Sequence, residues 1–184
     1  GYPAFLANVS RLVIDFNREA DAPGLIAKAS DGIAIPGNAC DGRTRIGWWH
    51  DYHDMLGQRI AANRPNLIVS LHSFTPHLAE RPHEERPWEI GILYNRDDRT
   101  ARIALPLLKV AGVVAGDQLP YSGKLLNATM NMHAEANAIS YLGIEVRQDL
   151  IADDAGVAHW ANLLRPVIAA CLDHFARERE AGSR

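Results

Sequence analysis

The feature that most constrains the fold is an alternation, along the chain, of short apolar runs with amphipathic or polar segments. Runs rich in β-branched residues and bounded by turn-forming residues are typical of buried strands. Such runs occupy 9–16, 66–72, 88–95 and 141–150. A helical spacing of apolar residues occurs over 47–63, 97–112, 128–140 and 154–180. Because strands alternate with helices, the sequence predicts an α/β fold with a mixed, largely parallel central sheet flanked by helices.

Three segments rich in glycine, proline and polar residues, 20–46, 77–88 and 114–124, are predicted to be loops. Pro106 falls inside the predicted helix 97–112 and is expected either to kink that helix or to mark its true start. In open α/β sheets ligands bind beyond the ends of the strands. Functional residues are therefore expected in the loops that follow the strands.

Size and charge exclude several classes of protein. A chain of 184 residues suits one domain, predicted to span 1–184. The net charge is −3 and the basic residues are scattered, so no nucleic-acid partner is expected. No membrane span or signal peptide is expected either. Cys40 and Cys171 lie far apart and are predicted to be reduced thiols of a cytoplasmic protein.

Residues that could take part in chemistry stand at the ends of the predicted strands. The run 66–72 ends on His72, which is either a satisfied core histidine or a metal ligand or base. Glu145 and Arg147 are two residues apart on a strand and point to one face, so they form either a structural ion pair or part of a site. Arg18, after the first run, is either in a loop salt bridge or available to an anionic substrate.

Other candidates are weaker. His50 and His53 share one face of a predicted helix and are expected to be solvated. The HEER sequence at 83–86 lacks the second histidine of a zinc-binding HExxH motif and is interpreted as loop charge. His133 is either a residue behind a metal site or a buried polar anchor.

An ordered set of sequence blocks resembles the N-formylglutamate amidohydrolase family. The blocks are RLVIDFNR (11–18), DGIAIPGN (31–38), SLHSFTP (70–76), IGILYNRD (90–97), GDQLPYSG (116–123), HAEAN (133–137) and GIEVRQDLI (143–151). The resemblance extends from about residue 8 to about residue 175. It implies an α/β fold similar to those of zinc carboxypeptidases and aspartoacylase, with one catalytic zinc.

The resemblance also implies roles for individual residues. His72 matches a zinc-binding histidine, and Glu145 matches the glutamate that handles the proton of the attacking water. Asn17 and Arg18 resemble a pair that holds a substrate carboxylate. Arg147 is then a second clamp. The same resemblance suggests that Tyr121, in the PYSG loop, closes over the substrate.

The family has an earlier segment with an Asp-His motif, and this segment supplies the remaining zinc ligands. We therefore expect that the natural protein starts upstream of Gly1 and that those ligands lie there. The implied activity is hydrolysis of N-formyl-L-glutamate, or a similar N-acyl acidic amino acid, to formate and L-glutamate in histidine degradation. Two alternatives are a catalytically silent module that binds an acidic amino acid, and an amidohydrolase or peptidase with another acyl substrate.

Overall fold

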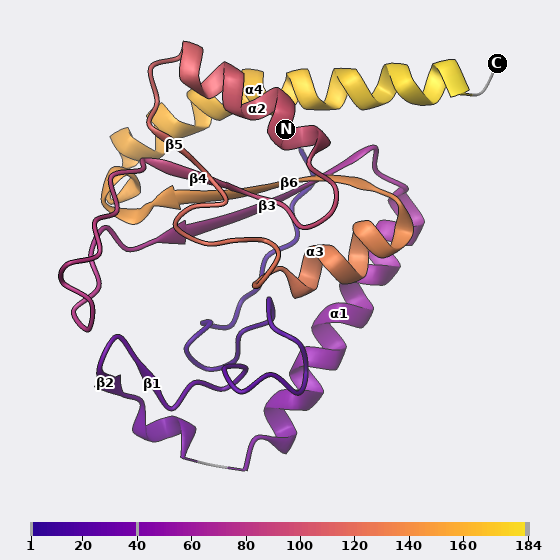
Figure 1. Cartoon of the computed structure of the whole chain (residues 1–184). Helices are drawn as coiled ribbons and strands as arrows, with labels where there is room; N and C mark the ends of the chain where they lie inside the picture. The colour runs from indigo at the N-terminus through magenta and orange to yellow at the C-terminus, as the bar shows by residue number, and fades with distance from the viewer. Residues whose placement is uncertain (1, 40, 183–184) are drawn as a thin grey trace. The chain divides into compact units, whose positions relative to one another are not determined.

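The computed structural model describes residues 2–39 and 41–182, which belong to two compact units, Gly1–Arg64 and Pro65–Arg184 (Figure 1). The prediction of one domain over 1–184 stays a prediction. Cys40 lies outside the described residues, and the prediction for its thiol stays untested.

The first unit contains helix α1, Arg43–Asn63, which begins at Arg43 rather than at the predicted residue 47. The helix ends where Arg64 takes a left-handed conformation, with φ of 45°. Before the helix, strands β1 (Ala29–Ser30) and β2 (Ile33–Ala34) form a short antiparallel hairpin, and a 3-10 helix, η1, spans Pro36–Asn38. Asp31 and Gly32 connect the two strands with positive φ, as tight hairpin turns require.

The predicted strand at 9–16 is wrong. The backbone amides of Val13 and Ile14 donate to the carbonyl of Ser10 and form a turn. The Ser10 hydroxyl accepts a hydrogen bond from the Leu12 amide, and an Arg11–Asp15 ion pair spans the turn. Such local hydrogen bonds offer the backbone an alternative to a sheet. Ile14 and Phe16 of this segment pack instead in a small core with Leu25 and Trp49.

The second unit is built on a four-stranded sheet in the order β3-β6-β4-β5. The strands are β3 (Leu67–Phe74), β4 (Ile90–Leu93), β5 (Ala115–Asp117) and β6 (Ser140–Arg147). The pairs β3–β6 and β4–β5 are parallel and the pair β4–β6 is antiparallel. The mixed, largely parallel sheet is therefore confirmed. Strand β5 was predicted as loop, because three residues are too few to show a period.

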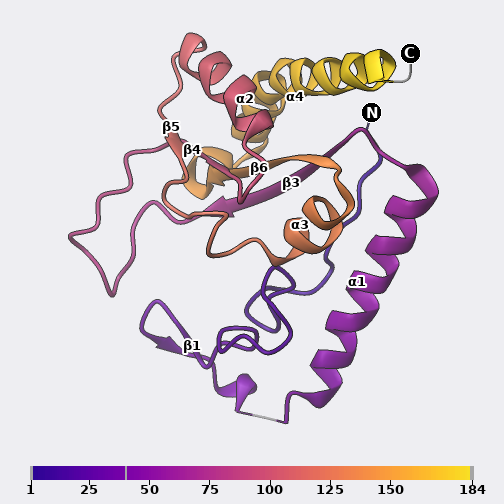
Figure 2. The same cartoon turned by 45° about the vertical axis from the view of Figure 1, so that its right-hand side comes forward.

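Helices lie on both faces of this sheet (Figures 1 and 2). Helices α2 (Arg99–Val110) and α4 (Asp154–Gly182) pack on one face, over a core that contains Ile92, Ile144 and Trp160. The other face carries α3 (Ala128–His133), which is followed by the 3-10 helix η2 (Glu135–Asn137). A further 3-10 helix, η3 (Gln148–Ile151), connects β6 to α4. Pro106 lies inside α2.

Helix α4 contains a stretch, Asp154–Glu178, whose length and composition would suffice to cross a membrane. The core helix of a globular domain passes the same test. Here Trp160, Leu164, Val167 and Cys171 are buried in the core beside the sheet. This packing favours a core helix over a membrane span.

Candidate active site

His72 and Glu145 occupy directly paired positions on neighbouring strands. Strand β3 runs parallel to β6, and the register pairs His72 with Glu145. Paired residues on adjacent strands direct their side chains to the same face of a sheet. The imidazole and the carboxylate therefore lie on one face near the carboxyl ends of two parallel strands, where open α/β sheets bind their ligands.

The alternation along β6 decides which face this is. Ile144 and Val146 pack into the core with α2 and α4, so Glu145 and Arg147 point to the opposite face, as the sequence predicted. Glu145 is only 5% exposed. A carboxylate buried to this extent is costly unless polar partners hold it or chemistry uses it.

His72 is half-buried rather than enclosed in the core. Its Nε2 atom lies 3.0 Å from the hydroxyl oxygen of Ser70, two residues earlier on the same face of β3. A hydroxyl can donate to a ring nitrogen or accept from it, so this contact orients the ring in either tautomer. A half-buried position beside Glu145 favours a role in the site over that of a core histidine.

Two glycines continue this row across the sheet. Gly91 of β4 is the register partner of Glu145, and Gly116 of β5 is the partner of Gly91. A side chain at either glycine would collide with the carbonyl oxygen of Leu119. The missing Cβ atoms let the loop after β5 lie directly on the sheet. This loop leads to Tyr121 and brings it toward the face that carries Glu145.

Hydrogen bonds from Gln118 fix this loop. Its backbone amide donates to the carbonyl of Ile92 at 3.0 Å, and its side-chain amide donates to the carbonyl of Tyr94 at 2.6 Å. Its side-chain oxygen accepts from the amide of Gly123 at 2.8 Å. The loop therefore has a defined position over the end of β4.

Sequence reasoning missed Arg86, which it interpreted as loop charge. The side chain of Arg86 is 1% exposed. One guanidinium nitrogen, Nη1, donates to the hydroxyl of Tyr121 at 3.2 Å and to the carbonyl of Thr75 at 3.2 Å. Nε and Nη2 donate to Glu84 at 3.2 and 3.0 Å. The only sequence feature that could have indicated a buried role for Arg86 was its position just before the apolar run 88–95.

Arg147, at the end of β6, is held by Asp149. Nε and Nη2 of Arg147 donate to the two carboxylate oxygens of Asp149 at 2.8 and 3.2 Å. This pairing lowers the pKa of Asp149 below its ordinary value. Nη1 makes longer contacts, of 3.5 and 3.4 Å, with the carbonyls of Arg86 and Trp88. The ion pair of Arg147 is thus with Asp149 and not with Glu145, the partner in one of the two interpretations of the sequence.

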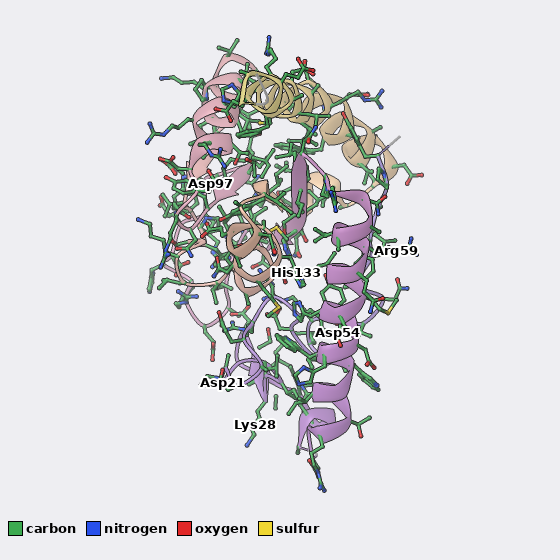
Figure 3. The ribbon with its side chains drawn as sticks, turned by 90° about the vertical axis from the view of Figure 1, so that its right-hand side faces the viewer. Asp21, Lys28, Asp54, Arg59, Asp97 and His133 are labelled. Carbon is green, nitrogen blue, oxygen red and sulfur yellow. The ribbon has the colours of Figure 1, made fainter. Side chains whose placement is uncertain are left out.

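His133, labelled in Figure 3, ends α3. Its exposed fraction is 7%. Burial lowers the pKa of its imidazole and favours the neutral ring. Helix α3 packs on the face of the sheet that carries Tyr141 at the start of β6. Its burial agrees with a polar anchor, and the proposed place behind a metal site stays a prediction.

In the first unit, Asp15 organises the turn that holds Asn17 and Arg18. One oxygen of the Asp15 carboxylate accepts from the Asn17 amide at 3.0 Å. The other accepts from Arg11 at 2.8 Å and from Nε of Arg18 at 3.3 Å. The loop salt bridge considered for Arg18 is therefore present. The two candidate clamp residues are placed together by one buried carboxylate.

Helix α1 supports the same turn. The indole nitrogen of Trp49 donates to the carbonyl of Arg18 at 2.9 Å. Nε2 of His53 lies 3.0 Å from the carbonyl oxygen of Phe16. His53 is 4% exposed, so the expectation that it is solvated is wrong. Its partner, a backbone carbonyl 37 residues away, could not be read from local spacing.

The predicted site residues fall into two groups. His72, Tyr121, Glu145 and Arg147 belong to the second unit, and Asn17 and Arg18 belong to the first. Within residues 2–39 and 41–182, no three histidine, cysteine, aspartate or glutamate side chains form a metal-binding group. A catalytic zinc takes about three protein ligands. His72 and its described neighbours therefore do not make a complete zinc site.

A model of the N-formylglutamate amidohydrolase family matches residues 1–152. The chain belongs to this family. The family acts on a small substrate derived from an amino acid, and the chain is a hydrolase that acts on an amide bond. No curated protein is similar enough to the chain to count as a match.

Two solved structures share the fold of this amidohydrolase. The gene product Atu2144 from Agrobacterium tumefaciens has 30% sequence identity and a TM-score of 0.77, over 90% of this chain and 69% of its own. The N-formylglutamate amidohydrolase from Ralstonia eutropha JMP134 has 21% identity and a TM-score of 0.61, over 93% of this chain and 74% of its own. The second likeness shows the fold alone.

Proposed function

We propose that this amidohydrolase hydrolyses N-formyl-L-glutamate to formate and L-glutamate, as a cytoplasmic enzyme of histidine degradation. The observation that supports this most strongly is the pairing of His72 with Glu145 across β3 and β6 in a member of this family. The pairing puts an imidazole and a carboxylate on one face at the carboxyl ends of parallel strands. Such a pair would let the imidazole bind a metal ion while the carboxylate takes up the proton of a water molecule at the same reacting centre.

Glu145 acts as the general base. It takes a proton from the water that attacks the formyl carbon and returns that proton to the departing nitrogen of glutamate. Its burial keeps bulk water away from this transfer. The water oxygen adds to the formyl carbon and gives a tetrahedral intermediate, and the C–N bond breaks when the C=O bond re-forms. The second proton of the water ends on the released amino group, so formate and the ammonium form of L-glutamate are the products.

The arginines bind the carboxylates of the substrate. Arg147 ends the strand that carries Glu145, and its guanidinium can form a two-pronged hydrogen bond with a carboxylate. Asn17 and Arg18 are further clamp residues, and the Asp15 carboxylate keeps them together. A substrate carboxylate would compete with Asp149 for Arg147. Arg147 would then pair with Asp149 in the free enzyme and with the substrate in the complex.

The proposed cofactor is one zinc ion, with His72 as one of its ligands. The other ligands are not identified among residues 2–39 and 41–182. Zinc content is tested by elemental analysis of purified protein, before and after His72→Ala. An equal zinc content in His72→Ala and in a wild-type protein that contains zinc would remove His72 from the ligand set.

The substrate is tested by following the release of L-glutamate from N-formyl-L-glutamate. N-acetyl-L-glutamate and N-formyl-L-aspartate serve as matched compounds that change the acyl group or the side chain. We expect the highest kcat/KM for N-formyl-L-glutamate. A preference for another acyl group would show that the proposed substrate is wrong but that the proposed reaction, amide hydrolysis, is right. Binding of L-glutamate without any hydrolysis would favour the silent binding module.

A further inference from the structure

We propose that Arg86 is a positioning residue that holds and polarises Tyr121, so that the tyrosine hydroxyl donates a hydrogen bond to a carboxylate of the substrate. The inference rests on the proposed function and adds to it. It gives Tyr121 a defined chemical role and introduces Arg86, which neither the family resemblance nor the sequence pattern indicated.

The hydrogen bonds of Arg86 fix its orientation. Nε and Nη2 both donate to one carboxylate oxygen of Glu84, which leaves Nη1 to reach Thr75 and Tyr121. A buried guanidinium is tolerated when its donors are paired in this way. Lysine lacks the planar guanidinium group, so a lysine at this position could not bind Glu84 and Tyr121 at the same time. Arg86 therefore connects the end of β3, at Thr75, to the loop of Tyr121.

The direction of the hydrogen bond decides what Tyr121 can do. Arg86 donates to the tyrosine oxygen, so the hydrogen of the hydroxyl points away from the guanidinium. Among residues 2–39 and 41–182, none accepts that hydrogen. Tyr121 is half-buried, which leaves its hydroxyl within reach of a ligand. The hydroxyl can therefore donate a hydrogen bond to a bound ligand, in a direction that Arg86 fixes.

The charge of Arg86 strengthens this donor. A hydroxyl that accepts a hydrogen bond from a cation is polarised and donates more strongly, and a buried site enhances the effect. The guanidinium carbon also lies 5.2 Å from the centre of the Tyr121 ring, which holds the ring in place. An anionic oxygen is the acceptor that gains most from such a donor.

The position of Tyr121 suits a substrate carboxylate. Tyr121 follows Leu119 by two residues, and the carbonyl of Leu119 lies over Gly91, the register partner of Glu145. The loop lies over β4 and β5, on the side of Glu145 away from His72. The start of the loop thus lies beside Glu145, and the hydroxyl of Tyr121 is connected through Nη1 of Arg86 to Thr75, just after β3. We expect this hydroxyl to bind the substrate and not to assist the bond-breaking step.

The test compares Tyr121→Phe, Arg86→Lys and the double variant. KM and kcat are measured with N-formyl-L-glutamate, and the affinities for L-glutamate and succinate are measured by calorimetry. We expect each single variant to raise KM and weaken binding by about tenfold, the effect of one charge-assisted hydrogen bond, with kcat changed less than about twofold. The double variant should be no worse than Tyr121→Phe, because Arg86 acts through the tyrosine.

Tyr94→Phe is the matched control, since it removes a hydroxyl that donates to Asp117 at an exposed position. It should leave KM unchanged. Tyr121→Phe keeps the ring, so it decides the proposal even if Arg86→Lys fails to fold. Unchanged KM and affinity in Tyr121→Phe, or additive effects in the double variant, would overturn the proposal.

The binding measurements separate this proposal from the proposed function. Wild-type protein that binds L-glutamate but does not hydrolyse N-formyl-L-glutamate would refute the proposed reaction. The comparison of Tyr121→Phe with wild type for L-glutamate and succinate would still decide the role of Tyr121. Wild-type protein that binds neither carboxylate would overturn both.

Discussion

Glu145 is the register partner of His72 on one side and of Gly91 on the other. The sheet therefore places an imidazole, a buried carboxylate and a position without a side chain in one row. The row is flanked on the glycine side by the loop of Tyr121.

Replacing Glu145 with glutamine tests the proton-transfer role. The amide cannot accept the proton of the attacking water, so kcat should fall roughly 100- to 10,000-fold, while KM changes little. Steady-state kinetics with N-formyl-L-glutamate measure both values, and zinc content and thermal unfolding are checked in parallel. Near-normal turnover in a folded variant would exclude Glu145 as the base.

Arg147 and Asp149 test the clamp. Arg147→Gln should raise KM roughly 10- to 100-fold, the effect of a lost hydrogen bond between charged groups, and should leave kcat nearly unchanged. Asp149→Asn removes the competing resting partner of Arg147 and should leave KM unchanged or lower it. If both variants raised KM alike, the pair would have a structural role only.

Gly91 tests whether the sheet must leave room for the Leu119 carbonyl. In Gly91→Ala the new Cβ would collide with a backbone oxygen, which costs about 1–3 kcal/mol in the free energy of unfolding. The displaced loop should also raise KM, because it leads to Tyr121. Gly47→Ala is the control: it lies within α1 with no neighbouring atom to meet, and should stabilise by about 0.5–1 kcal/mol. Equal stability of the two variants would contradict the close approach.

Tyr141 tests a buried polar network at the other end of β6. Its hydroxyl donates to Glu135 at 2.9 Å and accepts from Asn127 and from the amide of Asn95. Burial, above all, raises the pKa of Tyr141 and keeps it neutral. Tyr141→Phe removes one hydrogen bond from each of these groups and leaves the Asn95 amide without its acceptor, so it should lower the free energy of unfolding by about 1–3 kcal/mol in urea denaturation. The control Tyr94→Phe removes a hydroxyl whose hydrogen bond to Asp117 is exposed, and it should lose less than about 0.5 kcal/mol. A similar small loss at both positions would argue against the network.

His133 predicts a pH dependence of stability. Burial lowers the pKa of His133 below its ordinary value of 6.5, so the unfolded chain binds this proton more readily than the folded chain. The free energy of unfolding should therefore fall as the pH drops through 6.5 toward the lower pKa of the folded state. Urea denaturation at pH 7.5 and pH 5.5 measures this loss, and His133→Gln should reduce it. His174→Gln, at an exposed site on α4, should leave it unchanged. An identical loss in His133→Gln and wild type would contradict the prediction.

Local patterns were enough to predict most elements of the second unit. The β-branched runs gave β3, β4 and β6, and the apolar spacing gave α2 and α4, because the side-chain periods of strands and helices are properties of neighbouring residues. The alternation along β6 also gave the face of Glu145 and Arg147. The roles of His72 and Glu145 followed from the family resemblance, and they stay predictions.

Other features depended on residues far apart in the sequence. The predicted strand 9–16 does not form because Ser10 and Asp15 accept hydrogen bonds from neighbouring backbone amides. In addition, no sheet partner for this segment lies among the described residues of its unit. His53 was predicted to be solvated and Arg86 to be a charged loop residue. Their hydrogen-bond partners, Phe16 and Tyr121, are 37 and 35 residues away, so the local sequence does not reveal them.

By itself, the sequence determined the class of the fold, the positions of β3, β4, β6, α2 and α4 along the chain, and the kinds of side chain at the ends of β3 and β6. Only the tertiary structure decided that β3 lies next to β6, that His72 meets Glu145 in register, and that Arg86 holds Tyr121. The physical reason is that strand order and register result from the packing of the sheet against its helices. That packing is a sum over distant contacts, and no local period records it.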